Sequence, residues 1–251
     1  MKFVTGFFMA WGNFLSLPCP LKRWDSNLKN IMLAFLPSVG LVIGLLWMLL
    51  YWLADYFKIP ETMAALILMV FIYGICGFMH LDGFMDCNDA IMSRRPLEER
   101  QRILKDSHTG AFAVITLVLL FIGFYVSIYT ALEGLDIMNL LIIPVISRGV
   151  SAICVLSYKP IGHSQYVKDY EEKGRAKYRI AVIFQVVTVV CAGLYFSLRW
   201  IDTLACSLLM IIVGFLVCGY ARKQLGGMSG DIAGYTISIT ELAGILMLAI
   251  I

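Results

Sequence analysis

Three aspartates stand at helical spacing in one short segment of the chain: Asp82, Asp86 and Asp89. At about 100° per residue these positions fall on one face of a helix, so their carboxylates would lie side by side. Like charges at this spacing destabilise a helix, and ionised carboxylates near a membrane are costlier still. A bound divalent cation would compensate, and carboxylates with open coordination positions favour Mg²⁺ or Mn²⁺ shared with phosphate. We predict that these aspartates bind Mg²⁺; a solvated acidic helix end is the alternative.

Further polar residues lie on either side of this segment. His80 would face almost the opposite side of a continuous helix, which weakens it as a ligand of the same ion. Lys105, Asp106 and Ser107 follow in a loop and would supply a cation, an acid and a hydroxyl group. Taken alone, Lys105 could be an interfacial anchor, and Asp106 or Ser107 could be the N-cap of the next helix.

Two more features involve charged residues in or beside apolar runs. The segment from Gly226 to Asp231 is rich in glycine, so Gly230 would let the backbone approach a ligand, and Asp231 could complete an acidic site or cap a helix. Arg148 and Glu241 lie inside apolar runs, where charges pair or line a cavity. They could form an ion pair, or Arg148 could bind a substrate phosphate, whose oxygens match its planar guanidinium.

The chain that carries these residues has 251 amino acids, of which 60% are hydrophobic and 15% charged, and its mean hydropathy is +0.83. Soluble proteins are about half apolar and a quarter charged, and disordered chains are poor in apolar residues. The composition therefore excludes both a soluble fold and a disordered chain. We predict an all-α polytopic integral membrane protein in which residues 1–251 form a single membrane domain.

Seven apolar runs are each near the length of about 20 residues that a helix needs to cross the hydrocarbon core. Seven transmembrane helices are therefore expected, and six is the alternative because Pro37 and Gly40 allow part of the long first run to lie outside the core. The predicted spans are residues 31–57, 62–79, 111–131, 137–157, 180–198, 203–220 and 232–251.

Basic residues separate sharply between the two sets of connections. Of the 20 Lys and Arg residues, only Lys58 and Arg199 lie in the connections of one side, and Arg148 lies inside a span. By the positive-inside rule the basic connections and the N-terminus face the cytoplasm, and the C-terminus lies outside. We predict a multi-pass protein of the cell membrane with its site loops on the cytoplasmic face.

The N-terminal segment has the charged start and apolar stretch of a signal peptide. However, Leu17, Pro18 and Cys19 stand where a cleavage site of small residues would be expected. We therefore expect a retained helix that lies on the cytoplasmic interface of the membrane.

Taken together, the segments resemble the cobalamin synthase family, which has adenosylcobinamide-GDP ribazoletransferase activity. The resemblance extends from about residue 7 to the C-terminus. Cys87 and Asn88 stand where threonine and alanine are usual, and Met79, Phe84 and Met85 replace simpler apolar residues, but the acidic positions are intact. The matching segments are Phe14-Leu15-Ser16-Leu17-Pro18-Cys19-Pro20, Leu36-Pro37-x-x-Gly40, His80-Leu81-Asp82-Gly83 with Asp86 and Asp89, Lys105-Asp106-Ser107-x-x-Gly110, Gly226-Gly227-x-x-Gly230-Asp231 and Thr240-Glu241-Leu242.

The resemblance implies an enzyme that joins adenosylcobinamide-GDP to α-ribazole or its 5′-phosphate, releases GMP and requires Mg²⁺. Its partners would be these small molecules and the lipid bilayer, without nucleic acid, and an oligomer is compatible with the sequence. A pyrophosphate on the metal would present its cobinamide-side phosphorus to a ribose hydroxyl. The candidate catalytic residues are Asp82, Asp106 and Asp231, the candidate metal ligands are Asp82, Asp86 and Asp89, and the candidate substrate-binding residues are His80, Lys105, Ser107, Arg148 and Gly230.

Asp106, Asp231 and His80 are alternative proton acceptors for this reaction, and Lys105 and Arg148 would hold phosphate oxygens. The acidic helix is also similar to that of membrane CDP-alcohol phosphotransferases, although the arginine after the second acidic pair of their motif is absent here. A secondary transporter would instead place charges near the midplane on broken helices and contain internal repeats. A purely structural membrane protein would not explain why three aspartates share one helical face.

Overall fold

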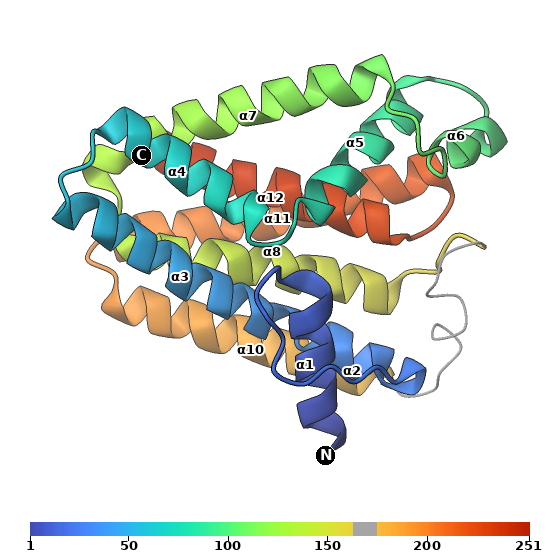
Figure 1. The fold of residues 1–251 in the computed structure, drawn as a ribbon, viewed down its shortest axis with the longest axis horizontal. Helices are drawn as coiled ribbons and strands as arrows, with labels where there is room; N and C mark the ends of the chain where they lie inside the picture. The colour runs from blue at the N-terminus through green and yellow to red at the C-terminus, as the bar shows by residue number, and fades with distance from the viewer. Residues whose placement is uncertain (163–174) are drawn as a thin grey trace.

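The computed structural model describes residues 1–162 and 175–251, and its elements in this part of the chain are helices (Figure 1). Six of them are long and apolar enough to cross a membrane. They are α3 (Leu36–Tyr56), α7 (Ala111–Ala131, continued by the short helix η2, Leu132–Gly134), α8 (Ile137–Ser157), α10 (Arg175–Phe196), α11 (Trp200–Leu225) and α12 (Gly230–Ile250). The prediction of an all-α polytopic membrane protein is confirmed.

The second predicted span, residues 62–79, is not one continuous helix. It consists of α4 (Glu61–Gly74), and the next helix, α5 (Met79–Met92), leaves at an angle of 83°. At 1.5 Å per residue α4 is only about 21 Å long, less than the hydrocarbon core of about 30 Å. The count is therefore six straight spans, or seven when the bent pair of helices is taken as one.

Helix α8 forms the centre of the bundle, with 83% of its most apolar stretch buried, and it packs against α3, α10, α11 and α12. The contact with α3 is close because two residues of α3 that face α8, Gly40 and Gly44, are glycines. A Cβ atom on Gly44 would lie 2.7 Å from the carbonyl oxygen of Leu141, and Gly40 approaches the backbone of Pro144 in the same way. Small residues allow this close packing of membrane helices, in which van der Waals contact replaces the hydrophobic effect.

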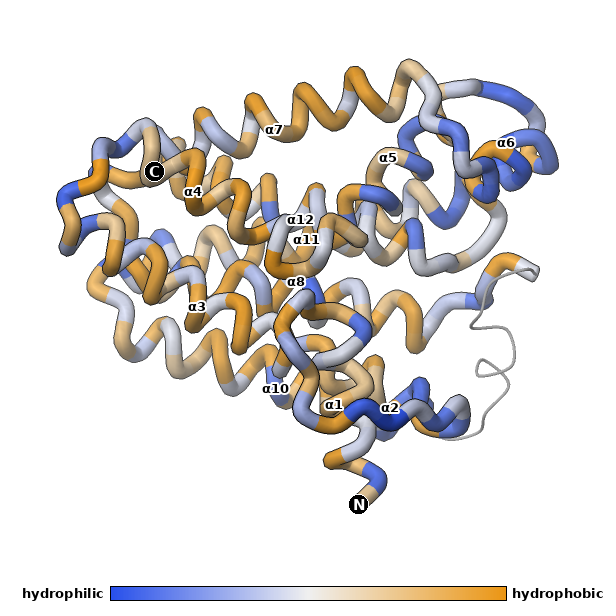
Figure 2. Tube along the Cα trace, viewed as in Figure 1, coloured by the Kyte–Doolittle hydropathy of each residue, from blue (hydrophilic) through white to orange (hydrophobic). Residues whose placement is uncertain are grey.

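The connections between the spans divide between two ends of the bundle (Figure 1). At one end lie α6 (Leu97–Ile103) and the α11–α12 turn, and Figure 2 shows hydrophilic residues concentrated there. At the other end Arg199 donates a hydrogen bond to the carbonyl oxygen of Ile251 (3.0 Å), so the α10–α11 turn lies beside the C-terminus. This arrangement agrees with the alternation of spans that the basic residues predict.

The N-terminal segment forms α1 (Lys2–Phe14), the short helix η1 (Ser26–Leu28) and α2 (Lys29–Ala34). With 13 residues α1 is about 20 Å long and too short to span the core, and Figure 1 shows it running across the direction of the spans. Gly6 of α1 lies directly against Ile31 of α2, so a side chain there would separate the two helices. The expected N-terminal helix is present and is packed on the bundle.

Candidate active site

The chain turns sharply at residues 75–78, between α4 and α5. Gly77 and Phe78 both adopt left-handed backbone angles, with φ of 61° and 60°. This region is unfavourable for a bulky residue such as Phe78 and requires support from its surroundings. Ser16, which follows α1, provides that support, because its backbone N–H donates to the carbonyl oxygen of Ile75 (2.8 Å). The turn fixes the direction of the acidic helix α5 relative to α4.

Helix α5 carries the three aspartates in one uninterrupted helix, as their spacing predicts. Asp82 is exposed, and Asp86 and Asp89 are half-buried. Asp86 lies close enough to Asp82, Asp89 and Asp231 for all of these charges to repel its own. Within residues 1–162 and 175–251, no Lys, Arg or His forms an ion pair with Asp82, Asp86 or Asp89. The like charges of α5 are therefore not compensated by a basic side chain of the described chain.

Two glycines bring Asp231 to this cluster by letting α5 and α12 cross in backbone contact. A Cβ atom on Gly83 would lie 2.8 Å from the Cα atom of Asp231, and one on Gly234 would lie 3.1 Å from the Cα atom of His80. Such distances leave no room for a side chain. Ser229 caps α12 by accepting a hydrogen bond from the N–H group of Ile232 (3.3 Å), so the alternative of Asp231 as the helix cap is wrong.

A cavity of about 170 Å³ lies where α5, α12, α8 and the N-terminal helices meet. His80 is 7% exposed, and its Nε2 atom has no hydrogen-bond partner among the residues that the structure describes. The cavity therefore combines carboxylates, a buried imidazole and apolar walls. Its polar lining consists of Asn13, His80, Asp82, Ser151, Gly230 and Asp231.

The loop from Lys105 to Gly110 contacts the acidic helix α5 near Asp89. Lys105, Asp106 and Ser107 are all exposed, and none of them lines the cavity. Asp106 accepts a hydrogen bond from the backbone N–H of His108 (3.0 Å) and lies 2.6 Å from its ring Nδ1 atom. These bonds lower the pKa of Asp106, and the bond to Asp106 raises the pKa of His108.

The helix that follows this loop begins against the acidic cluster. Its N-cap is Gly110, so Asp106 and Ser107 do not cap it. The Asp89 carboxylate lies directly on Gly110, at a distance that leaves no space for a Cβ atom. The loop and the acidic helix are thus in contact at Gly110, while the Lys105 and Asp106 side chains are exposed to solvent.

Arg148 is not among the residues that line the cavity, and its predicted role in phosphate binding stays a prediction. Its guanidinium forms an ion pair with Glu241, and both side chains are 1% exposed. It also donates to the Ser147 hydroxyl (3.1 Å) and to the Cys76 sulfur (3.4 Å) in the α4–α5 turn. Burial beside Glu241 satisfies the charge inside the protein, so the predicted alternative, an intramembrane ion pair, is the observed one.

The predicted metal ligands, Asp82, Asp86 and Asp89, would provide only part of a coordination sphere. Within the described residues, no group of three or more His, Cys, Asp or Glu side chains converges closely enough to hold a metal ion. Mg²⁺ commonly binds through one or two carboxylates, several waters and substrate phosphates, without a cage made only of protein. The carboxylates of α5, without a basic partner among the described residues, fit that second mode in their chemistry, and their metal binding stays a prediction.

Sequence reasoning missed two polar residues of the cavity, Asn13 and Ser151. Asn13 comes from the last turn of α1, and Ser151 is a single small polar residue within the buried helix α8. Neither has a motif or a helical spacing that relates it to the aspartates. Only the packing of α1 and α8 against α5 brings them to the site.

The fold and the site define a class of protein: a helical multi-pass membrane protein with an acidic cavity formed by helices from distant parts of the chain. Comparison with known families then identifies it. Residues 6–249 match the model of the cobalamin-5-phosphate synthase family, and the chain belongs to this family. It is therefore an enzyme of cobalamin synthesis, a transferase, as the resemblance of its motifs implies.

Curated relatives cover nearly the whole chain. Proteins called adenosylcobinamide-GDP ribazoletransferase match it in Clostridium perfringens strain SM101, with 36% identity over 97% of this chain and 96% of the relative, and in Clostridium botulinum strain Alaska E43, with 33% identity over 96% and 95%. One from Shewanella denitrificans is 31% identical over 94% of this chain and 90% of the relative. No solved structure matches the chain.

Proposed function

We propose that this chain joins adenosylcobinamide-GDP to α-ribazole or α-ribazole 5′-phosphate at the α5–α12 cavity, giving adenosylcobalamin or its 5′-phosphate and GMP. The observation that carries the proposal is the crossing of α5 and α12, which gathers Asp82, Asp86, Asp89 and Asp231 around one region. The cavity at this crossing has a volume of about 170 Å³, below the several hundred Å³ of ordinary ligand pockets. It would therefore hold the reacting groups while most of each substrate lies outside.

The proposed reaction is a displacement at phosphorus. A ribose hydroxyl of the acceptor forms a bond to the cobinamide-side phosphorus, the bond from that phosphorus to the bridging oxygen breaks, and GMP leaves with the bonding electrons. The hydroxyl proton passes to a protein carboxylate or imidazole. Hydroxyl groups suit a cavity lined by Asp82, Asp231, His80 and Ser151, because these side chains accept hydrogen bonds and orient the attacking oxygen.

Mg²⁺ is part of the proposal. Bound to the pyrophosphate, it would neutralise charge that develops on the departing GMP. Asp82, Asp86 and Asp89 are the residues proposed to hold it, since they lie on one helix without a basic partner among the described residues. The exposed Lys105 is proposed to hold phosphate oxygens at the mouth of the site, and Gly230 to give the substrate backbone access.

Asp231 is the proposed proton acceptor. Its support is its place in the cavity wall beside Asp82, whereas the carboxylate of Asp106 is exposed and bonded to His108. Asp106 and Ser107 are proposed to act from the loop by contacting the nucleotide. His80 is proposed to bind the acceptor through its Nε2 atom, which has no hydrogen-bond partner in the described part of the chain.

We further propose that the protein lies in the cell membrane with its N-terminus and the acidic cavity on the cytoplasmic side. The support is the distribution of basic residues, which favours the cytoplasm for the end that carries α6 and the α11–α12 turn. Water-soluble nucleotides would reach the site from that side.

The function is tested by measuring GMP release from the purified protein in detergent, with adenosylcobinamide-GDP, α-ribazole 5′-phosphate and Mg²⁺. Release that depends on both substrates and stops with EDTA is the expected result. GMP release without the acceptor would indicate hydrolysis, and no release from folded protein would contradict the proposed substrates. Undiminished release in EDTA would contradict the role of Mg²⁺ alone.

A further inference from the structure

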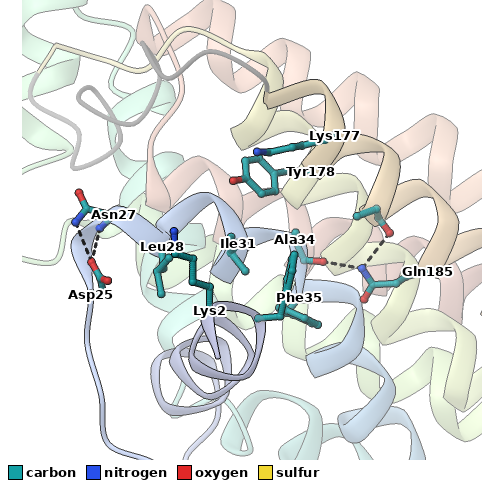
Figure 3. A pocket seen from close by; sticks show the side chains of 12 residues that line it. Lys2, Asp25, Asn27, Leu28, Ile31, Ala34, Phe35, Lys177, Tyr178 and Gln185 are labelled. Carbon is teal, nitrogen blue, oxygen red and sulfur yellow. Dashed lines mark hydrogen bonds between the residues drawn. The ribbon is translucent and has the colours of Figure 1, made fainter.

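A second cavity, of about 810 Å³, lies between α1, α2 and the first turns of α10 (Figure 3). It is separate from the acidic cavity, and α2 forms the wall between them. Leu33 of α2 lines the acidic cavity, whereas Ile31 and Ala34 line the second one. Neither the family resemblance nor the proposed reaction gives this cavity a role.

The inner wall of the second cavity is apolar. Phe3, Ile31 and Phe35 contribute large side chains to it. Gln185 closes it on the α10 side by donating hydrogen bonds to the carbonyl oxygens of Ala34 (2.7 Å) and Ala181 (3.0 Å), as Figure 3 shows. The Gln185 side chain is thus bonded to backbone carbonyls, and the surface formed by Phe3, Ile31 and Phe35 suits a hydrocarbon chain.

The rim of the same cavity carries two cations. Lys2 comes from α1 and Lys177 from α10, and neither forms an ion pair with a residue that the structure describes. The acid of the rim, Asp25, is engaged locally, since its carboxylate accepts hydrogen bonds from the backbone N–H (2.9 Å) and side-chain amide (3.1 Å) of Asn27. An anionic group could therefore bind at the lysines.

The surroundings indicate the level of the lipid headgroups. Trp24, next to the rim, is 59% exposed, and exposed tryptophan is typical of the membrane–water interface. On the same first turns of α10, the apolar side chains of Ile180 and Phe184 are exposed, 66% and 71% respectively, as expected for a lipid-facing helix. An amphiphile at this cavity would have its charge at the interface and its chain beside the bilayer core.

We propose that this cavity binds an anionic phospholipid, with its phosphate at Lys2 and Lys177 and an acyl chain against Phe3, Ile31 and Phe35. Charge complementarity at the rim and an apolar wall beside the lipid-facing surface of α10 both favour a phospholipid over a free anion. A basic residue near an anionic membrane contributes about 1 kcal/mol. Loss of both lysines should therefore weaken binding by about 30-fold.

The test is native mass spectrometry of the full chain in detergent, titrated with phosphatidylglycerol and, separately, with phosphatidylcholine. We expect the wild type to retain phosphatidylglycerol preferentially and the double variant Lys2→Gln/Lys177→Gln to bind it about 30-fold more weakly. The matched control is Lys22→Gln/Lys223→Gln, which removes two exposed lysines that do not line the cavity and should leave the affinity unchanged.

A second variant tests the apolar wall without a change of charge. Ala181→Phe places a ring in the cavity and should also reduce phosphatidylglycerol binding, while size-exclusion elution stays normal. Equal weakening in the lysine control, or wild-type affinity in both Lys2→Gln/Lys177→Gln and Ala181→Phe, would overturn the proposal. Displacement of the lipid by inorganic phosphate or GMP would overturn it in favour of a free-anion site.

Discussion

Two groups of charged residues in this protein differ in whether a partner of opposite charge neutralises them. In the core, Arg148 and Glu241 neutralise each other, and both side chains are 1% exposed. At one end of the bundle, Asp82, Asp86 and Asp89 repel one another without a basic partner in the part of the chain that the structure describes. The charges of the first group are thus neutralised within the protein. The carboxylates of the second are exposed or half-buried, so water, a proton or the proposed Mg²⁺ can offset their repulsion.

The largest expected effect comes from breaking the acidic group. Asp82→Asn keeps the shape of the side chain and removes a charge, so we expect Mg²⁺-dependent GMP release to fall by about 10³-fold, or about 4 kcal/mol of transition-state stabilisation. The thermal unfolding temperature should not fall, because the variant relieves repulsion. Asp55→Asn, an exposed aspartate paired with Lys58 at the other end of the bundle, is the control. Normal release from Asp82→Asn would remove the basis for the metal site.

Breaking the buried Arg148–Glu241 pair should lower stability, whereas Asp82→Asn should lower activity. Arg148→Met leaves the buried Glu241 without its cationic partner, and only the Ser147 hydroxyl still donates to it (3.0 Å). We expect a loss of about 3 kcal/mol in the free energy of unfolding, measured by denaturant titration in detergent micelles. The double variant Arg148→Met/Glu241→Leu should recover most of this loss, because it leaves no unpaired charge. If the double variant loses as much free energy of unfolding as Arg148→Met and Glu241→Leu together, the unpaired charge is not the cause of the instability.

The crossing of α5 and α12 connects the two groups and can be tested at a glycine. Gly83→Ala would place a Cβ atom 2.7 Å from the carbonyl oxygen of Asp231, so the helices must separate. We expect a destabilisation of about 1–3 kcal/mol together with slower GMP release, since Asp231 moves away from α5. Gly219→Ala in α11, where no atom of the described residues lies within 4 Å of a new Cβ, should be neutral or stabilising. Equal effects of the two variants would contradict the close crossing.

The smallest effect concerns the exposed loop. The hydrogen bond to Asp106 raises the pKa of His108, so NMR titration of the ring should give a pKa above the ordinary value of about 6.5. This bond stabilises the loop fully below that ordinary value and is lost as the pH rises through the raised pKa. Asp106→Asn should return the pKa of His108 to the ordinary range. An unchanged pKa in that variant would show that the bond does not form in solution.

Several features could be predicted from the sequence because they are local or compositional. Hydrophobic runs set the spans, since about 20 apolar residues are needed to cross the core whatever the neighbouring helices are. The spacing of Asp82, Asp86 and Asp89 set a shared helical face, since a helix has 3.6 residues per turn in any context. Both expectations hold in α5 and in the six long helices.

The tertiary structure alone decided which distant residues meet. The turn at Phe78 depends on support from Ser16, and the position of Asp231 depends on the glycine contacts between α5 and α12. The sequence left Arg148 with two alternatives because its partner stands 93 residues away. Asn13 and Ser151 enter the cavity by packing alone. Such contacts depend on the path of the backbone, which the local pattern of residues does not contain.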